Sequence, residues 1–286
     1  MNLFSKCYAR IDRAIEHSNR MAELWNDARL RNMVEFRLEV DYKGCGTMWL
    51  EEISSDLPLE LELELGEFLY QLRAALDGAV YACAIEDSSA NPPPDASRIE
   101  FPICAREDEW RRQSKKVAAL NSGRRRFIGL MQPFAEPDLS PELRICNYNR
   151  SLRFLNDLAR MDRHRTLHSL CTAVAGAKPL LRLPKGVKLL KLKTCEVGNL
   201  EGEPLATFEL GGWRPGLQIS ANPNVDLNIS IREIEPPCFD NDYLSERLQS
   251  MVYSTRMIIL ALECNKWKEP GDTPTGKIQE ACDNPR

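Results

Sequence analysis

The spacing of apolar residues changes along this chain of 286 residues, and the change limits the folds that the chain can adopt. Up to about residue 175, apolar side chains recur mostly at intervals of three and four, which is typical of amphipathic helices. Between Pro179 and Glu235, short apolar and β-branched runs are separated by clusters of Pro, Gly and Asn, which is typical of antiparallel strands. Helices followed by strands predict an α+β protein rather than alternating βαβ units.

The same patterns predict five helices, a hairpin and five later strands. The helices are expected over residues 4–33, 66–83, 108–131, 141–175 and 243–267. The hairpin is expected over residues 36–42 and 47–53, and the later strands over residues 180–183, 187–197, 205–210, 217–221 and 227–234. The expected fold is a helical bundle core with an N-terminal β-hairpin and an antiparallel sheet in the C-terminal third, closed by a long C-terminal helix.

The change of pattern also suggests where the chain divides. Residues 1–177 are predicted to form a mainly helical domain, although one compact unit is an alternative. Residues 178–268 are predicted to form an antiparallel β segment and a final helix that packs back on the bundle. Residues 269–286 contain several Pro and Gly residues and are predicted to be a flexible tail.

Composition excludes several classes of function. The net charge of −4 gives no general attraction to nucleic acid, so any contact with RNA requires a local basic patch. The N-terminus does not resemble a signal peptide, and no apolar run approaches the roughly 18 residues of a membrane span. Ten cysteines are spread singly without a Cys-x-x-Cys pair, so we predict reduced thiols, a cytoplasmic protein, no membrane partner and no structural zinc or other cofactor.

One predicted helix carries several polar residues of the types that occur in catalytic and binding sites. Winding residues 149–168 at about 100° per residue places a set of hydrogen-bonding side chains within one stripe. The stripe contains Asn149, Arg153, Asn156, Arg160, Arg163 and His164, with His168 just beyond its edge. Asp162 falls on the opposite side among apolar residues, so its carboxylate requires a partner.

Arg73 and Asp77 are candidates to pair with Asp162. They stand four residues apart at the edge of the apolar face of the second helix, within reach of each other. A structural interpretation is that Arg73, Asp77, Asp162 and Arg163 form ion pairs that align two helices. Functional sites have the same composition, so the sequence leaves both interpretations open.

Four short segments, taken in order, resemble a family. Leu72-Arg-Ala-Ala-Leu-Asp77, Phe101-Pro-Ile103, Gln132-Pro-Phe134 and Asn156-Asp-Leu-Ala-Arg-Met-Asp-Arg-His-Arg165 are similar to an uncharacterised family of bacterial proteins. That family has an LR-x-x-LD helix and a later D-[KR]-H-R helix, and the resemblance covers about the first two-thirds of the chain. It implies no known activity.

Arg163 and His168 also resemble, more weakly, the Arg and His signature of the HEPN superfamily of helical ribonucleases and nucleic-acid-binding domains. The resemblance implies metal-independent RNA cleavage in a homodimer, with His168 or His164 transferring protons and Arg163 or Arg160 holding the phosphate. Asn156 and Arg153 would support substrate binding. The later sheet is a departure from a minimal helical bundle.

Other residues of the chain indicate other functions less clearly. His164 and His168 have the spacing of two metal ligands on a helix, but the neighbouring Arg163 and Arg165 repel a cation, so no metal is predicted. His17 is interpreted as a packing residue, and Arg124-Arg-Arg126 as a solvated face. No serine or cysteine lies in a context typical of a nucleophile. The alternative function is a non-enzymatic module that binds a ligand or a protein.

Overall fold

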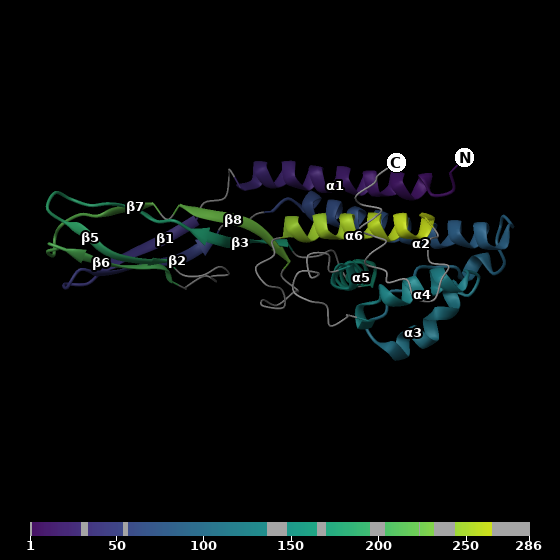
Figure 1. Cartoon of the computed structure of the whole chain (residues 1–286). Coiled ribbons are helices and arrows are strands. Elements are labelled where there is room, and N and C mark those ends of the chain that lie inside the picture. Colours follow the sequence, from purple (N-terminus) through teal and green to yellow (C-terminus); the bar gives the residue numbers. More distant parts are fainter. Residues whose placement is uncertain are drawn as a thin grey trace. The chain divides into compact units, whose positions relative to one another are not determined.

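The computed structural model describes residues 2–29, 34–53, 57–135, 148–164, 170–194, 204–222, 224–231 and 244–264. The protein is mixed α+β, as the sequence predicts, with six α-helices and eight strands among the described residues (Figure 1). No described helix is both long enough and apolar enough to cross a membrane. The predicted tail at residues 269–286 lies outside the described residues.

The chain forms two compact units, and each one combines stretches that are far apart in sequence. The helical unit contains residues 1–20, 63–167 and 245–286. The sheet unit contains residues 21–62 and 168–244. This division differs from the predicted boundary at residues 177 and 178, because the N-terminal hairpin pairs with a strand from the later part of the chain.

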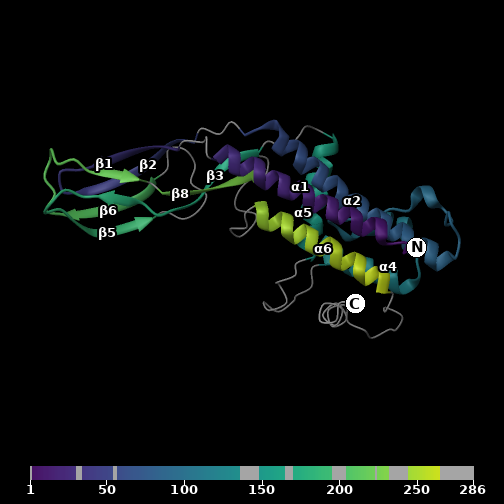
Figure 2. The same cartoon turned by 90° about the horizontal axis from the view of Figure 1, so that it is seen from above.

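The helices lie in the segments that the apolar spacing predicts, except that the single helix expected over residues 108–131 is two helices, separated by residues 114–121. They are α1 (Ser5–Arg29), α2 (Leu59–Ser88), α3 (Glu107–Gln113), α4 (Ser122–Leu130), α5 (Tyr148–His164) and α6 (Leu244–Cys264). Figures 1 and 2 show α1, α2 and α6 running alongside one another. At one end, Glu263 of α6 accepts hydrogen bonds from the Tyr8 hydroxyl at 2.6 Å and from the Asn2 amide at 2.7 Å. Side chains at three- and four-residue spacing in α1 are buried, among them Cys7, Ile11 and Ala14, as is Phe4 just before the helix.

The prediction of one long helix over residues 141–175 is wrong for the C-terminal part of that range. Helix α5 ends at His164, and Leu170–Ala177 is strand β3, which pairs antiparallel with β8 (Val225–Ile231). Thr172 and Val174 in this segment are β-branched, and such residues suit a strand that has a partner. Residues 141–147 and 165–169 lie outside the described residues.

The predicted hairpin is confirmed. Strand β1 (Val34–Val40) pairs antiparallel with β2 (Cys45–Ile53). In the turn, the Asp41 carboxylate accepts the backbone N–H groups of Lys43 and Cys45 at 2.9 and 2.8 Å. Gly44 between them has φ of +85°, a conformation that favours glycine.

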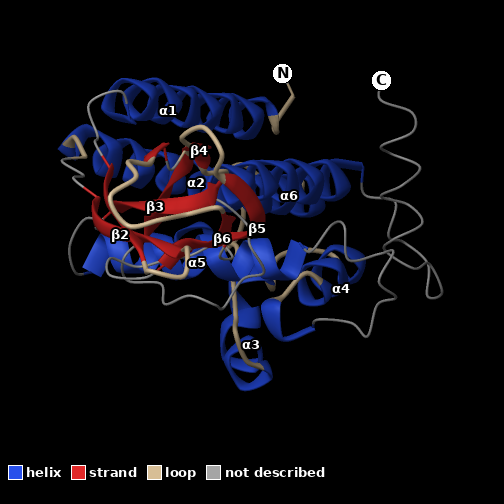
Figure 3. Cartoon of the chain, turned by 90° about the vertical axis from the view of Figure 1, so that its left-hand side faces the viewer, coloured by secondary structure: helices blue, strands red, loops and turns tan. Residues whose placement is uncertain are grey.

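The later strands complete three antiparallel sheets, drawn in red in Figure 3. The largest has the order β1-β2-β6-β5, with β6 at Pro204–Gly211 and β5 at Lys188–Thr194. The other two pair β3 with β8, and β4 (Leu180–Arg182) with β7 (Ser220–Asn222). One face of the four-stranded sheet, called here the inner face, is buried in two clusters. Met48, Leu50 and Leu205 form one cluster, and Phe208 and Leu210 form the other with Val187, which lies just before β5.

Gly46 packs closely against Phe208 in the sheet unit. The two residues are opposite each other in the pairing of β2 with β6, and a Cβ atom at Gly46 would lie 2.1 Å from the Phe208 ring. We therefore expect Gly46→Ala to lower the free energy of unfolding by about 1–3 kcal/mol, because the ring must move out of a packed position. Urea unfolding followed by circular dichroism measures the change.

The double variant Gly46→Ala/Phe208→Leu is the matched control. Once the ring is removed, the added methyl group should cost much less than it does in the wild-type background. An unfolding midpoint unchanged by Gly46→Ala alone would contradict this packing.

Candidate functional site

Helix α5 presents part of the predicted polar stripe to solvent. Arg153 and Arg160 are exposed and Asn156 is half-buried. Arg163 and His164 occupy the last turn of the helix, but their side chains lie outside the described residues, as does the whole of His168. The structure therefore places three of the predicted substrate-binding and phosphate-holding residues on one helix, without placing the two histidines against them.

Asn149, at the start of the stripe, has a structural role instead. It is buried, and its amide donates to the carbonyl oxygens of Leu130 at 3.2 Å and Gln132 at 2.7 Å. These contacts attach the first turn of α5 to the end of α4. Arg153 lies one turn further along and has a different environment, with its guanidinium 3.8 Å from the Asp157 carboxylate at the surface.

Three of the four segments that carry the family resemblance are connected by hydrogen bonds. The Asp77 carboxylate accepts the Phe101 N–H at 2.9 Å, and the Arg73 guanidinium donates to the Phe101 carbonyl at 3.3 Å. The buried Gln132 accepts the Cys104 N–H at 2.8 Å and donates to the Pro102 carbonyl at 2.9 Å. These bonds satisfy the backbone of an extended segment that has no sheet to pair with. We call this set of contacts the motif network.

The structure separates Asp162 from the pair in α2. Arg73 and Asp77 do approach each other, at 3.8 Å. The Asp162 carboxylate instead lies against Gly66, where it would be 3.0 Å from a Cβ atom. Gly66 is seven residues before Arg73, or about 10 Å along the helix axis. Burial raises the pKa of Asp77, against the opposing effects of Arg73 and the Phe101 N–H.

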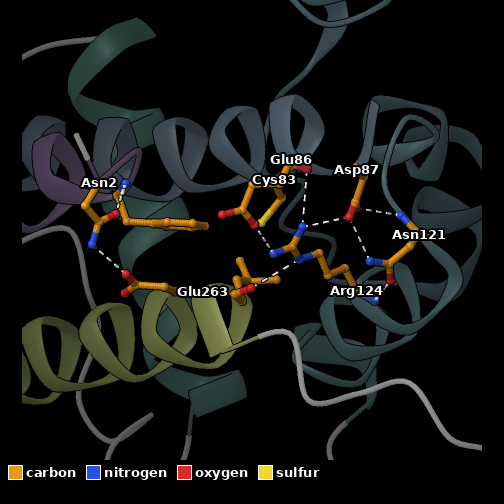
Figure 4. A network of polar contacts seen from close by, with 9 residues as sticks. Asn2, Cys83, Glu86, Asp87, Asn121, Arg124 and Glu263 are labelled. Carbon is orange, nitrogen blue, oxygen red and sulfur yellow. Dashed lines mark hydrogen bonds and ion pairs between the residues drawn. The ribbon is translucent and has the colours of Figure 1, made fainter. Parts of the chain in front are cut away.

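Arg124 contradicts the predicted solvated face of Arg124-Arg-Arg126. Its side chain is fully buried, whereas Arg125 and Arg126 are exposed. Figure 4 shows its guanidinium between two carboxylates of α2, at 2.5 Å from Glu86 and 2.8 Å from Asp87. The signal that could have revealed it is its spacing, because position 124 continues the buried positions of Phe127, Ile128 and Met131 backwards at helical intervals.

The buried arginine connects three helices. Its Nε also donates to the Leu262 carbonyl of α6 at 3.1 Å, and Asn121, the N-cap of α4, donates to Asp87 through its backbone and its amide. A buried cation needs such compensation. This second network, like the motif network, links elements of the helical unit through buried side chains.

A cavity of about 450 Å³ lies beside α1 and α2 in the helical unit. Ala74, Gly78 and Ala82 of α2 are small and recur every four residues, so they leave room along one face of the helix. The cavity is lined by Asn2, Leu3, Ser5, Lys6, Cys7, Arg10, Ala74, Gly78, Tyr81, Ala82, Ile85 and Asn91. No local sequence pattern marks the cavity, because its lining comes from two segments about 65 positions apart.

Among the described residues that line this cavity, two are cations and none is acidic. Lys6 is exposed and makes no ion pair with the described residues. Arg10 donates to the Gln71 amide oxygen at 3.1 Å and lies over the Tyr70 ring at 5.9 Å. Burial raises the pKa of the Cys7 thiol to about 11, so this cysteine is protonated near neutral pH and is a poor nucleophile.

The described part of the chain contains no group of three or more His, Cys, Asp or Glu side chains that could hold a metal ion.

His17, interpreted from the sequence as a packing residue, is largely buried in α1 and lies 2.6 Å from the Glu64 carboxylate of α2. Its partner is therefore a side chain of the helical unit.

Replacing Arg124 tests whether the buried network supports the fold. We expect Arg124→Ala to lower the free energy of unfolding by about 3–5 kcal/mol, because Glu86 and Asp87 would lose the cation between them. Arg125→Ala, one residue along the same run and exposed, should change it by no more than about 0.5 kcal/mol. Urea unfolding compares the two, and equal effects would contradict the assignment.

The resemblance described above stays a prediction. Comparison of the chain with known proteins finds no matching family model, no matching curated protein and no matching solved structure.

Proposed function

We propose that this protein is a binding module for a small amphipathic anion, a molecule with a carboxylate or phosphate group and an apolar body. The observation that carries the proposal is the cavity beside α1 and α2, which has Lys6 and Arg10 and no acidic side chain among the described residues of its lining. Ligand sites in proteins are commonly concave, largely apolar and equipped with a few polar groups that orient the ligand.

The chemistry of the lining favours an anion with an apolar body. A carboxylate or phosphate gains charge-assisted hydrogen bonds from lysine and arginine. The apolar part would lie over Ala74, Gly78 and Ile85 and remove their surface from water, at roughly 25 cal/mol for each Å² of apolar area. The cavity volume of about 450 Å³ is within the usual range of small-molecule sites, roughly 300–1,000 Å³.

The same lining favours binding over chemistry. A general base or a nucleophile needs a pKa near the working pH, and burial moves the pKa of Cys7 away from it. Binding is therefore the function that these side chains suit.

Dodecanoate is a suitable probe, since it has one carboxylate and a flexible apolar chain. We expect the wild-type protein to bind it saturably by isothermal titration calorimetry. Lys6→Glu should weaken binding roughly 10–100-fold, because a charge-assisted hydrogen bond contributes about 1.5–3 kcal/mol and a repulsive charge replaces it. Ala74→Phe, which fills the cavity, should weaken it further.

Lys185→Glu is the matched control, because Lys185 is exposed in the sheet unit and the charge change is the same. It should leave the dissociation constant unchanged. Absence of binding by the wild-type protein, or binding that neither Lys6→Glu nor Ala74→Phe weakens, would reject the cavity as the site.

A second candidate function is the RNA-directed activity implied by the HEPN resemblance. The observation in its favour is that Arg153 and Arg160 are exposed on the same face of α5, two turns apart, and Arg160 makes no ion pair with the described residues. Arginines arranged in this way suit phosphate groups. Cleavage would need His164 or His168 as well, and the homodimer implied by the resemblance belongs to the same proposal.

A mixed RNA pool in EDTA tests this candidate, because EDTA removes metal-dependent cleavage. We expect Arg153→Ala/Arg160→Ala to weaken RNA binding about tenfold at low salt, since two phosphate contacts are lost. His164→Ala/His168→Ala should abolish cleavage while the circular dichroism spectrum is kept. If the wild-type protein neither binds nor cuts the pool, the RNA candidate is excluded.

A further inference from the structure

Strand β5 lies at an edge of the four-stranded sheet, whose order is β1-β2-β6-β5. All seven of its residues are exposed. Among the strands that the structure describes, none pairs with the outer side of β5, so the N–H and C=O groups on that side have no strand partner there. Such an edge can accept another extended chain.

The inner face of the sheet is poorly covered near β5. Leu189 and Leu192 stand opposite the buried Leu210 and Phe208 of β6, yet they remain 41% and 39% exposed. The apolar side chains that cover the neighbouring cluster come from β1, from β4 and from segments beside β4 and β7, including Leu38, Leu181 and Ile219. Leu190 of β5 is 67% exposed.

The charge on β5 has one sign. Lys188, Lys191 and Lys193 are exposed, and the strand has no acidic residue. Lys191 lies 3.4 Å from Glu209 of β6, whereas Lys188 and Lys193 make no ion pair with the described residues. The strand therefore combines an edge without a partner strand in the described part of the chain, exposed leucines and excess positive charge.

These features indicate which kind of chain could pair with the edge of β5. Lysines on an edge strand often prevent pairing, but a strand protected in this way has no reason to expose three leucines. A second copy of β5 would bring lysines together across the new pair, which is unfavourable. An acidic segment avoids this repulsion, and its carboxylates are attracted to the lysines instead.

We propose that β5 is the docking strand for an extended acidic segment of another protein, in which acidic and apolar residues alternate. The segment adds a fifth strand to the sheet through main-chain hydrogen bonds. Because successive side chains of a strand point to opposite faces, its apolar residues cover Leu189 and Leu192 on the inner face. Its carboxylates face Lys191 and Lys193 on the outer face, where Lys193 is opposite Thr207.

The probe is a fluorescein-labelled nine-residue peptide of alternating Glu and Val, added to the full chain and followed by fluorescence anisotropy. We expect saturable binding, and at least a tenfold weaker affinity for Lys188→Glu/Lys193→Glu. Arg125→Glu/Arg126→Glu makes the same change of charge on the exposed face of α4 and should leave the affinity unchanged. The same peptide with its central residue replaced by Pro should not bind, because Pro removes a donor and cannot continue a strand pair.

Three outcomes would overturn the proposal: no binding of the alternating peptide, equal binding by the Lys188→Glu/Lys193→Glu variant, or equal binding of the Pro peptide. Sedimentation that shows a dimer lost on Leu190→Glu would assign the edge to a second copy instead. The peptide assay does not depend on the cavity of the helical unit, so its failure leaves the proposed function untouched.

Discussion

The burial of Arg124 is the constraint on which the helical unit depends. A guanidinium without solvent is costly unless charged and hydrogen-bonding partners surround it. Its partners come from the last turns of two other helices, namely Glu86 and Asp87 in α2 and the Leu262 carbonyl in α6. All three helices must reach the right register before the charge is compensated. Few other arrangements of α2, α4 and α6 would satisfy this condition.

In the motif network, side chains from other elements likewise supply partners to polar groups, here to the backbone of an irregular segment. The segment around Phe101 has no sheet partner, so Asp77, Arg73 and Gln132 supply its hydrogen bonds. Side chains that attract attention in the sequence are thus occupied in holding the fold. The surfaces proposed to bind a ligand or a partner lie elsewhere, in the cavity beside α1 and α2, on the exposed face of α5 and at the edge of β5.

Local patterns accounted for most of the elements and for little of their assembly. The hairpin could be predicted because alternation and the turn lie within twenty residues. Its pairing with β6 could not, since β2 and β6 are about 155 positions apart and nothing local marks them as partners. Among the site residues, the exposed Arg153 and Arg160 follow from helical spacing. The cavity does not, because it needs α1 beside the small residues of α2.

By itself, the sequence determined the α+β class, the amphipathic helices and the alternating strands, because these depend on contacts and backbone bonds close in the chain. Tertiary structure decided the state of Leu170–Ala177, which becomes a strand because β8 supplies a partner from far along the chain. It also decided the burial of Arg124 beside the exposed Arg125. The physical reason is the same in both cases: a strand pair and a compensated buried charge need groups that only the folded chain brings together.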